Sequence, residues 1–242
     1  MRKVIVALLL FFLPSKLSFA LVQMIGGNKK YSFGKNSRIG FSFVYASKIQ
    51  MEEGSVILSG NIILIESITM ERKARIQRFN QIKGKFSLYL GQLAVINKYN
   101  RITSDRKNIR ISELHLGKNT IIGVSHLIDM TASVYIDDQA ILAGCGSQLW
   151  THGFYHSKQG PARWRVDGGI QIGKNVYVGS RCLICSGVSI CDAVTIGAGA
   201  VISKSISQSG LYVNQALRYI AFDPDQAIDQ LHKVSDGIYE KN

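Results

Sequence analysis

The hydrophobic residues of the C-terminal half recur at a strict interval of six. From position 172 onward an aliphatic residue occupies every sixth place, and a second small or aliphatic residue follows each one four places later. The first set comprises Ile172, Val178, Ile184, Ile190, Ile196 and Ile202, and the second comprises Val176, Cys182, Val188, Val194, Ala200 and Ile206. Six residues turn through roughly 600° in an α-helix, so a helix would scatter these side chains around its axis. The period therefore predicts short strands joined by corners.

Short strands with this period predict a parallel β-helix. Each hexapeptide forms one flat side, three sides complete a coil, and stacked coils bury an aliphatic core that no single coil can bury. Three less regular runs occur earlier: Phe33, Ile39, Tyr45, Met51, Ile57 and Ile63; then Ile76, Ile82 and Leu88; then Leu116, Ile122, Ile128 and Val134. We expect a mainly β domain over residues 28–222. Loops are expected near 89–112, where charged residues break the phase, and near 150–169, where the repeats stop.

Residues 1–27 are predominantly apolar. An unbroken apolar run, Val4–Leu13, follows Arg2 and Lys3 and is too short to span a bilayer. Three interpretations fit this segment: a secretory signal cleaved after Ala20, a retained anchor on the inner membrane face, or a helix that caps the hydrophobic end of the domain. We favour a retained apolar helix, for the reason given below.

The last segment, 223–242, predicts a short helix. Asp223 is a suitable N-cap, Pro224 suits the first helical position, and Gln226 stands where a capping-box partner belongs. We expect this helix to pack on the β-helix through Ile228 and neighbouring apolar residues.

Charge and cysteine content restrict the function further. Lys and Arg outnumber Asp and Glu by 29 to 16, which gives a net charge of +13 and favours an anionic partner. No zinc-finger, helix-turn-helix or RNA-binding aromatic motif accompanies this charge, so we do not expect nucleic acid. Cys182 falls on a small inward position of the repeat, and Cys185 and Cys191 replace corner residues. We therefore expect these cysteines to pack as small hydrophobic residues, and we expect no metal site.

Two further motifs accompany the repeat. The sequence "SQLWTH" lies at 147–152, and "GAGAVISKS" lies at 197–205. Together with the six-residue period they resemble the hexapeptide-repeat acyltransferases, among them the sugar O-acetyltransferases. The resemblance implies a left-handed β-helix, a homotrimer with active sites between neighbouring subunits, and acetyl-CoA as the donor for a sugar or glycan hydroxyl.

The resemblance also implies catalytic residues. His152 matches the family's general base, and an imidazole that titrates near neutral pH suits this task. No nucleophilic triad spacing is evident, so we expect direct transfer without an acyl-enzyme. His126 and Asp129 resemble a His-x-x-Asp element found in a subset of the family. They orient the base, bind the acceptor, or form only a polar corner pair.

The resemblance also implies where the donor binds, and the aromatic residues near the break in the repeats suggest where the acceptor binds. The coenzyme A groove is matched by Ser180, Ala198, Ser203, Lys204 and Arg218. Lys204 and Arg218 are cations suited to nucleotide phosphates. Asn214 and Ala216 depart from the family's Gly and Pro, which leaves the form of this turn open. The acceptor is expected at Trp150, His156 and Trp164, where the tryptophans stack on a sugar ring or pack beneath the loop.

Two other functions remain open. A zinc lyase resembling the γ-class carbonic anhydrases would use His126, His152 and His156, although the spacing of the last two differs from that family's. A non-catalytic β-helical scaffold is the third alternative. Because coenzyme A is absent outside the cytoplasm, we expect a cytoplasmic protein that associates with the inner membrane surface through residues 1–27.

Overall fold

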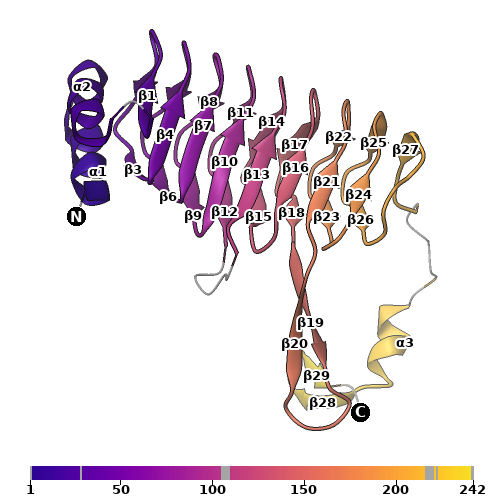
Figure 1. Ribbon diagram of the computed structural model, residues 1–242. Coiled ribbons are helices and arrows are strands. Elements are labelled where there is room, and N and C mark those ends of the chain that lie inside the picture. Colours follow the sequence, from indigo (N-terminus) through magenta and orange to yellow (C-terminus); the bar gives the residue numbers. More distant parts are fainter. Residues whose placement is uncertain (1, 28, 105–109, 216–220, 222, 241–242) are drawn as a thin grey trace.

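The computed structural model describes residues 2–27, 29–104, 110–215, 221 and 223–240. It is a parallel β-helix whose coils follow one another along a single axis, with two helices at the N-terminal end (Figure 1). The mainly β class expected from the six-residue period is confirmed.

Three parallel sheets form the faces of the β-helix, and each strand pairs with the equivalent strand of the next coil. Sheet A contains β1 (Tyr31–Phe33), β4 (Lys48–Met51), β7 (Ser67–Met70), β10 (Phe86–Leu90), β13 (Ser112–Leu116), β16 (Val134–Ile136), β21 (Ile170–Ile172) and β24 (Ser189–Ile190). Sheet B contains β2 (Arg38–Ile39), β5 (Val56–Ile57), β8 (Arg75–Ile76), β11 (Val95–Ile96), β14 (Ile121–Val124), β17 (Ile141–Cys145), β22 (Tyr177–Val178), β25 (Val194–Ile196) and β27 (Gly210–Tyr212). Sheet C contains β3 (Phe43–Tyr45), β6 (Ile62–Leu64), β9 (Gln81–Lys83), β12 (Arg101–Thr103), β15 (Leu127–Asp129), β18 (Gln148–Leu149), β23 (Leu183–Ile184) and β26 (Val201–Ile202).

The inward side chains follow the six-residue period. All six aliphatic residues from Ile172 to Ile202 are buried, with at most 6% of the side chain exposed. Among the earlier runs Tyr45 is the clearest exception, because its neighbour Val44 points inward instead. The result is one continuous aliphatic core along the axis.

The pairing register measures the length of each coil. Ile49 pairs with Tyr31, the residue that stands three hexapeptides earlier in the chain. Ile170 pairs with Val134 across twice that separation, because a long insertion leaves the stack within that coil.

The loop expected over residues 89–112 is much shorter than predicted. Most of this segment is regular coil, in which Leu90, Ile96 and Ile102 are buried in β10, β11 and β12. The expectation failed because the neighbouring coils are longer than three hexapeptides. Ile96 pairs with Ile76, whereas a coil of three hexapeptides would place it against Arg78, and this shifts the phase. Residues 105–109 lie outside the described part.

Two similar segments, "LGKN" at 116–119 and "IGKN" at 172–175, meet the same structural requirement. A Cβ at Gly117 would lie 2.5 Å from the backbone nitrogen of Asp138 in the next coil, so the coils approach too closely for a side chain. Two residues later, Asn119 and Asn175 adopt left-handed backbone conformations, with φ of 57° and 54°. Asparagine tolerates this conformation better than most residues.

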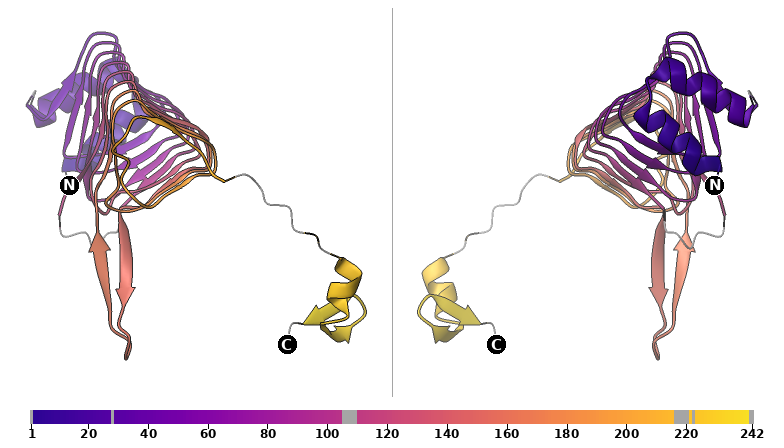
Figure 2. Two further views of the ribbon diagram at one scale, coloured as in Figure 1. Left: turned by 90° about the vertical axis from the view of Figure 1, so that its right-hand side faces the viewer. Right: turned by 90° about the vertical axis from the view of Figure 1, so that its left-hand side faces the viewer.

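Helices α1 (Arg2–Phe12) and α2 (Ser15–Gly26) cover the first coil (Figure 2). Val6, Leu10 and Val22 belong to the same buried core as the coils. The ring of Phe19 stacks on that of Phe33, with centroids 3.8 Å apart. The helices therefore close the apolar end of the β-helix. Within the described residues, no helix combines the length and the apolar character needed to cross a membrane.

The C-terminal segment contains the expected short helix, α3 (Pro224–Ile228), in which Asp223 accepts a hydrogen bond from the amide of Gln226. A small hairpin of β28 (His232–Ser235) and β29 (Ile238–Glu240) follows. The helix does not pack on the β-helix, contrary to our expectation, and lies apart from it (Figure 2). The helix is too short for its apolar residues to form one continuous face.

Candidate active site

The insertion in the long coil is an antiparallel hairpin of β19 (His152–His156) and β20 (Arg163–Asp167), which projects away from the β-helix (Figure 1). It leaves at the corner between sheets C and A, directly after β18. Because side chains alternate along a strand, His152, Phe154 and His156 share one face of the hairpin. The base of the hairpin, where His152 pairs with Asp167, is its point of contact with the β-helix.

His152 meets Asp129 at this base. Asp129 ends β15 in the preceding coil, and its Oδ2 lies 2.8 Å from Nδ1 of His152. The carboxylate is 7% exposed and the imidazole 24% exposed. Since the carboxylate can only accept, Nδ1 carries the proton, and the lone pair of Nε2 is available to take another. This arrangement suits a general base.

Two threonines fix the carboxylate in place. The backbone amide and the hydroxyl of Thr151 donate to Oδ2 of Asp129 at 3.1 Å and 2.6 Å, and the hydroxyl of Thr131 donates to Oδ1 at 2.8 Å. Thr151 is fully buried. Neither threonine was among the predicted site residues, although both adjoin the motifs, in "DMT" and "WTH". Together the two threonines fix the orientation of the Asp129 carboxylate, which in turn orients His152.

His126 lies elsewhere, at the other end of β15. It continues an inner ladder in which each polar side chain accepts the backbone amide of the equivalent residue in the next coil. The ladder runs through Ser42, Asn61, Asn80, Asn100, His126, Ser147 and Cys182. The Nδ1 atom of His126 accepts the Ser147 amide at 3.0 Å. The structure thus joins Asp129 to His152 but does not bring His126 to them.

The environment of His126 keeps its ring neutral. The side chain is 1% exposed, and burial lowers its pKa from the ordinary value of 6.5 to about 4. Its Nε2 atom faces the backbone carbonyl of Leu142 but makes no hydrogen bond of normal geometry within the described part of the chain. A neutral ring with one nitrogen engaged by the backbone has a structural role in the stack.

The three candidate acceptor residues are dispersed. Trp150 is half-buried beside the base, with its ring centroid 6.1 Å from that of His152. His156 lies four residues further along an extended strand, roughly 13 Å from His152. Trp164 pairs with Tyr155 and projects from the opposite hairpin face. Of these three residues, Trp150 alone lies beside His152 within one chain.

The candidate coenzyme residues lie along two edges of sheet C. Ser180 and Ala198 follow the paired residues Val178 and Ile196, so they occupy one corner in consecutive coils. Ser203 and Lys204 follow β26 at the other corner, the one from which the hairpin leaves. Lys204 and Thr151 have equivalent positions two coils apart, roughly 10 Å along the axis. Arg218 and Ala216 lie outside the described residues.

A hollow of about 460 Å³ lies beside the hairpin. Its lining includes Thr131, which donates to Asp129, and Asp167, the strand partner of His152, but neither His152 nor Asp129 itself. Its lining comes from the C–A corner, from the hairpin base and from the residues that precede β13, and it comprises Arg110, Ile111, Ser112, Thr131, Ala132, Ser133, Arg165 and Asp167. Arg165 forms a two-pronged ion pair with Asp167, at 2.8 Å and 3.0 Å. Arg110 was not among the predicted site residues, because only folding brings it to this hollow.

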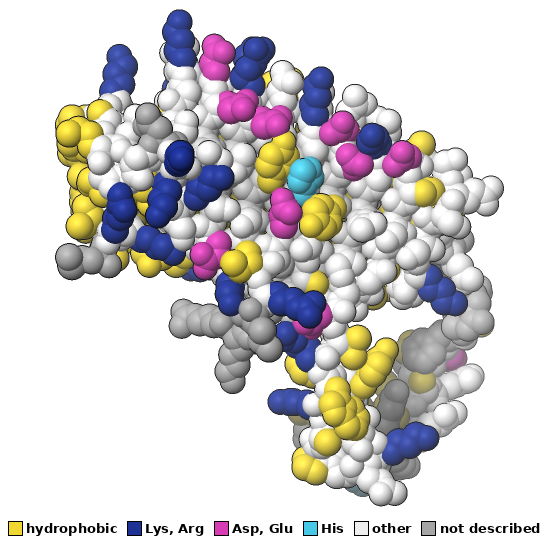
Figure 3. All heavy atoms as spheres, in the orientation of Figure 1, with side chains coloured by type: hydrophobic (Ala, Val, Ile, Leu, Met, Phe, Trp, Pro, Cys, Tyr) yellow, Lys and Arg dark blue, Asp and Glu magenta, His cyan; other side chains and the backbone are white. Residues whose placement is uncertain are grey.

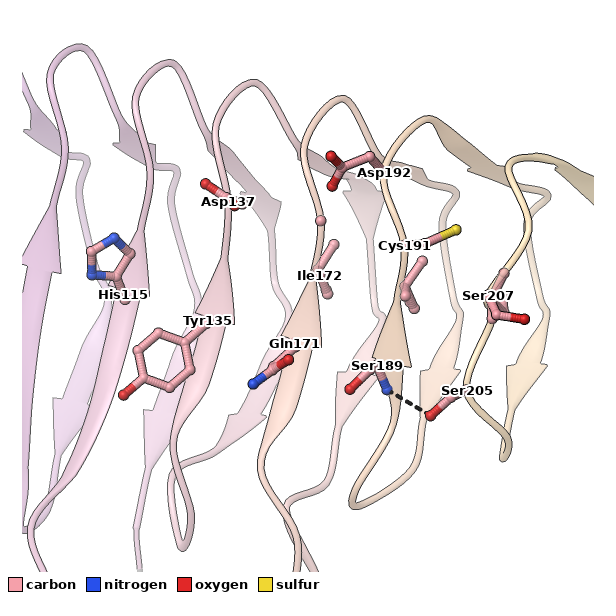
Figure 4. A pocket seen from close by; sticks show the side chains of 13 residues that line it. His115, Tyr135, Asp137, Gln171, Ile172, Ser189, Cys191, Asp192, Ser205 and Ser207 are labelled. Carbon is pink, nitrogen blue, oxygen red and sulfur yellow. Dashed lines mark hydrogen bonds between the residues drawn. The ribbon is translucent and has the colours of Figure 1, made fainter.

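A larger hollow, of about 640 Å³, lies on the outer face of sheet A (Figure 4). Its walls include Asp137, Gln171 and several serines, and Tyr135 lies between Gln171 and His115, which stands at one end. His115, the histidine among its residues, is stacked against Tyr89 at 4.4 Å between ring centroids. No hydrogen bond between His115 and a buried carboxylate is present among the described residues. The arrangement needed for a general base therefore favours the smaller hollow.

Comparisons with known proteins agree with the repeat architecture. The family model "Bacterial transferase hexapeptide (six repeats)" matches residues 169–204. The bifunctional protein GlmU of Campylobacter concisus is 27% identical over 169 residues, which are 67% of this chain and 33% of that protein. This chain thus spans a third of that relative's length.

Two solved structures are also similar. A maltose O-acetyltransferase from Clostridium difficile 630 is 25% identical and has a TM-score of 0.44, with 52% of this chain and 64% of that one covered. The polySia-specific acetyltransferase NeuO is 16% identical and has a TM-score of 0.41, with 72% of this chain and 71% of that one covered.

Proposed function

We propose that this hexapeptide-repeat protein is an acetyltransferase that moves an acetyl group from acetyl-CoA to a hydroxyl of a sugar or glycan. One observation carries the proposal: His152 is held through Nδ1 by a buried, fully engaged carboxylate at the point where the chain leaves the stack. A general base must be fixed in orientation and must keep one nitrogen accessible, and His152 meets both conditions.

The reaction needs one base and no covalent intermediate. The acceptor oxygen attacks the thioester carbonyl while Nε2 of His152 takes the hydroxyl proton. Asp129 stabilises the imidazolium that forms, as a carboxylate on Nδ1–H does in other acyl transfers. The tetrahedral intermediate then collapses, the carbon–sulfur bond breaks, and the departing thiolate receives the proton from Nε2.

The surroundings support a place for each substrate. The hollow lined by Arg110 and Arg165 receives the acceptor, because its lining also includes Thr131, which holds Asp129, and Asp167, the strand partner of His152. The donor lies along the C–A edge, where Lys204 meets a phosphate of the nucleotide end and the thioester reaches His152 two coils away. A homotrimer, in which a neighbouring β-helix closes the groove, completes this arrangement.

The geometry does not favour the zinc lyase. The described residues hold no group of three or more histidine, cysteine or carboxylate side chains positioned around one point. His126 already uses Nδ1 in the inner ladder, and His156 is four residues from His152 on an extended strand. The three histidines therefore do not converge within one chain.

The test is acceptor-dependent release of free thiol from acetyl-CoA, measured with a panel of sugars and oligosaccharides. Wild-type protein is expected to release thiol with at least one acceptor. His152→Ala is expected to lower the rate by roughly 10²–10⁴-fold, the range for a lost general base. His232→Ala is the matched control, because His232 is exposed in the C-terminal hairpin and should leave the rate unchanged.

Release that persists in His152→Ala would refute the assignment of the base. If wild-type protein neither releases thiol nor binds acetyl-CoA in a direct binding measurement, the acetyltransferase proposal is wrong and the scaffold alternative is favoured.

A further inference from the structure

The two N-terminal helices are apolar on both faces, and the β-helix covers only one of them. In α1 the buried residues Val6, Ala7 and Leu10 lie on the face turned toward the first coil. The opposite face remains uncovered. A globular protein seldom leaves a helix apolar on its solvent side unless another surface covers it.

The uncovered apolar residues of the two helices are together called the N-terminal apolar patch. It consists of Val4, Ile5, Leu8 and Phe12 from α1 and Leu17 and Met24 from α2, each between 42% and 82% exposed. Hydrophobic side chains gather at this end of the molecule (Figure 3). A shallow apolar hollow of about 350 Å³ runs along α1 beside Leu9 and Leu13.

Basic residues predominate near the patch, although Lys3 of α1 pairs with Glu66, the residue before β7, at 3.9 Å. Eight basic residues and no acidic residue precede Glu52, the first acidic residue of the chain. The basic residues are Arg2, Lys3, Lys16, Lys29, Lys30, Lys35, Arg38 and Lys48. Lys16 is exposed on α2, directly before Leu17 of the patch.

We propose that the N-terminal apolar patch docks onto an anionic lipid surface. Apolar side chains enter the boundary between headgroups and acyl chains, while the surrounding lysines and arginines meet the anionic headgroups. A second copy of this chain fits the charge poorly, because docking end to end would bring two such basic regions together. With 11 and 12 residues, α1 and α2 are about 17 Å long, so they lie on the membrane and do not cross it.

Docking in this way also sets the distance of the candidate active site from the membrane surface. The His152–Asp129 pair lies at the fifth and sixth strands of sheet C, counted from the helical end. At about 4.8 Å per coil this is roughly 20–25 Å from the first coil. The β-helix axis would then stand away from the surface, with its hairpin accessible to lipid-attached acceptors.

The test is co-sedimentation of the full chain with vesicles. We expect binding to vesicles of three parts phosphatidylcholine to one part phosphatidylglycerol, and weaker binding to phosphatidylcholine alone. Raising the salt from about 0.1 to about 0.5 M should weaken binding to the anionic vesicles, because the headgroup attraction is screened.

Variants locate the contact. Phe12→Glu and Leu8→Glu should each reduce partitioning at least tenfold. The matched control is Phe79→Glu, which makes the same change at a 51% exposed phenylalanine on a corner of the β-helix and should bind like wild type. Thermal melting of each variant checks that the fold is intact.

Three results would overturn the proposal. The first is failure of the intact chain to bind the anionic vesicles. The second is binding that Phe12→Glu and Phe79→Glu reduce equally. The third is concentration-dependent self-association that Phe12→Glu abolishes without any vesicle binding, which would assign the patch to a second copy of the chain.

Discussion

Replacing Asp129 separates the charge of the carboxylate from its role in orienting His152. The Oδ2 atom faces three donors: the Thr151 amide, the Thr151 hydroxyl and Nδ1 of His152. In Asp129→Asn, the amide oxygen is expected to stay at this position, because a flipped NH₂ group would oppose three donors. The Nδ2 group then donates to the Thr131 hydroxyl, which can also accept. The hydrogen-bond pattern survives and only the charge is lost.

The magnitude follows from that difference. A charge-assisted hydrogen bond contributes about 1.5 kcal/mol more than a neutral one, so Asp129→Asn should lower kcat about tenfold. Asp129→Ala removes the acceptor altogether and leaves the buried Thr151 amide without a partner. We expect kcat to fall by about 10³-fold, and the free energy of unfolding to fall by about 2–3 kcal/mol.

The assay is steady-state thiol release with kcat and KM determined separately, together with urea unfolding. The KM for acetyl-CoA should be unchanged in both variants, since Asp129 acts through His152 and does not touch the donor. Equal losses of kcat in Asp129→Asn and Asp129→Ala would refute the orientation argument. Full activity in Asp129→Ala would remove Asp129 from the site.

Four further outcomes follow from the structure. His126→Asn should keep full activity and nearly full stability, because it extends the run of asparagines Asn61, Asn80 and Asn100 in the inner ladder; a large loss of kcat would return His126 to the catalytic site. Between pH 6.5 and 4, His126 binds more protons in the unfolded chain than in the folded one. The free energy of unfolding should therefore fall by up to about 3 kcal/mol as the pH drops. The difference between the urea midpoints at pH 7 and pH 5 should be smaller in His126→Asn than in wild type. Leu10→Ala should lower the free energy of unfolding by about 2–4 kcal/mol in urea titrations, because Leu10 is 1% exposed against the first coil; a change below about 0.5 kcal/mol would contradict the capping role of α1. Lys204→Ala should raise the KM for acetyl-CoA about tenfold without changing the KM for the acceptor, and an effect on the acceptor alone would contradict the placement of the donor.

The six-residue period was sufficient to predict the coils, because each hexapeptide places its inward side chains at the same positions as the hexapeptide in the coil before it. The period predicted less where coils lengthen beyond three hexapeptides, as between Ile76 and Ile96, and there regular coil was mistaken for a loop. The C-terminal helix was predicted from its cap, but its packing depended on contacts that a sequence pattern does not contain.

The candidate site was predicted only in part, because its residues meet through the register of the coils. Asp129 and His152 are 23 residues apart in the chain, and the coil length brings them together once the register is known. His126 differs from Asp129 by only three positions, yet the two lie at opposite ends of β15. Arg110 entered the neighbouring hollow through a segment without any repeat, so periodicity gave no indication of it.

We propose that His152 catalyses direct transfer from acetyl-CoA to a hydroxyl. Isotope-labelled acetyl-CoA, incubated with the acceptor that best promotes thiol release, tests it most directly when the products of wild-type protein and His152→Ala are compared by mass spectrometry. We predict labelled acetyl on the acceptor, none on the protein, and loss of acceptor labelling in the variant. Label retained on the protein, or equal acceptor labelling by His152→Ala, would contradict the account.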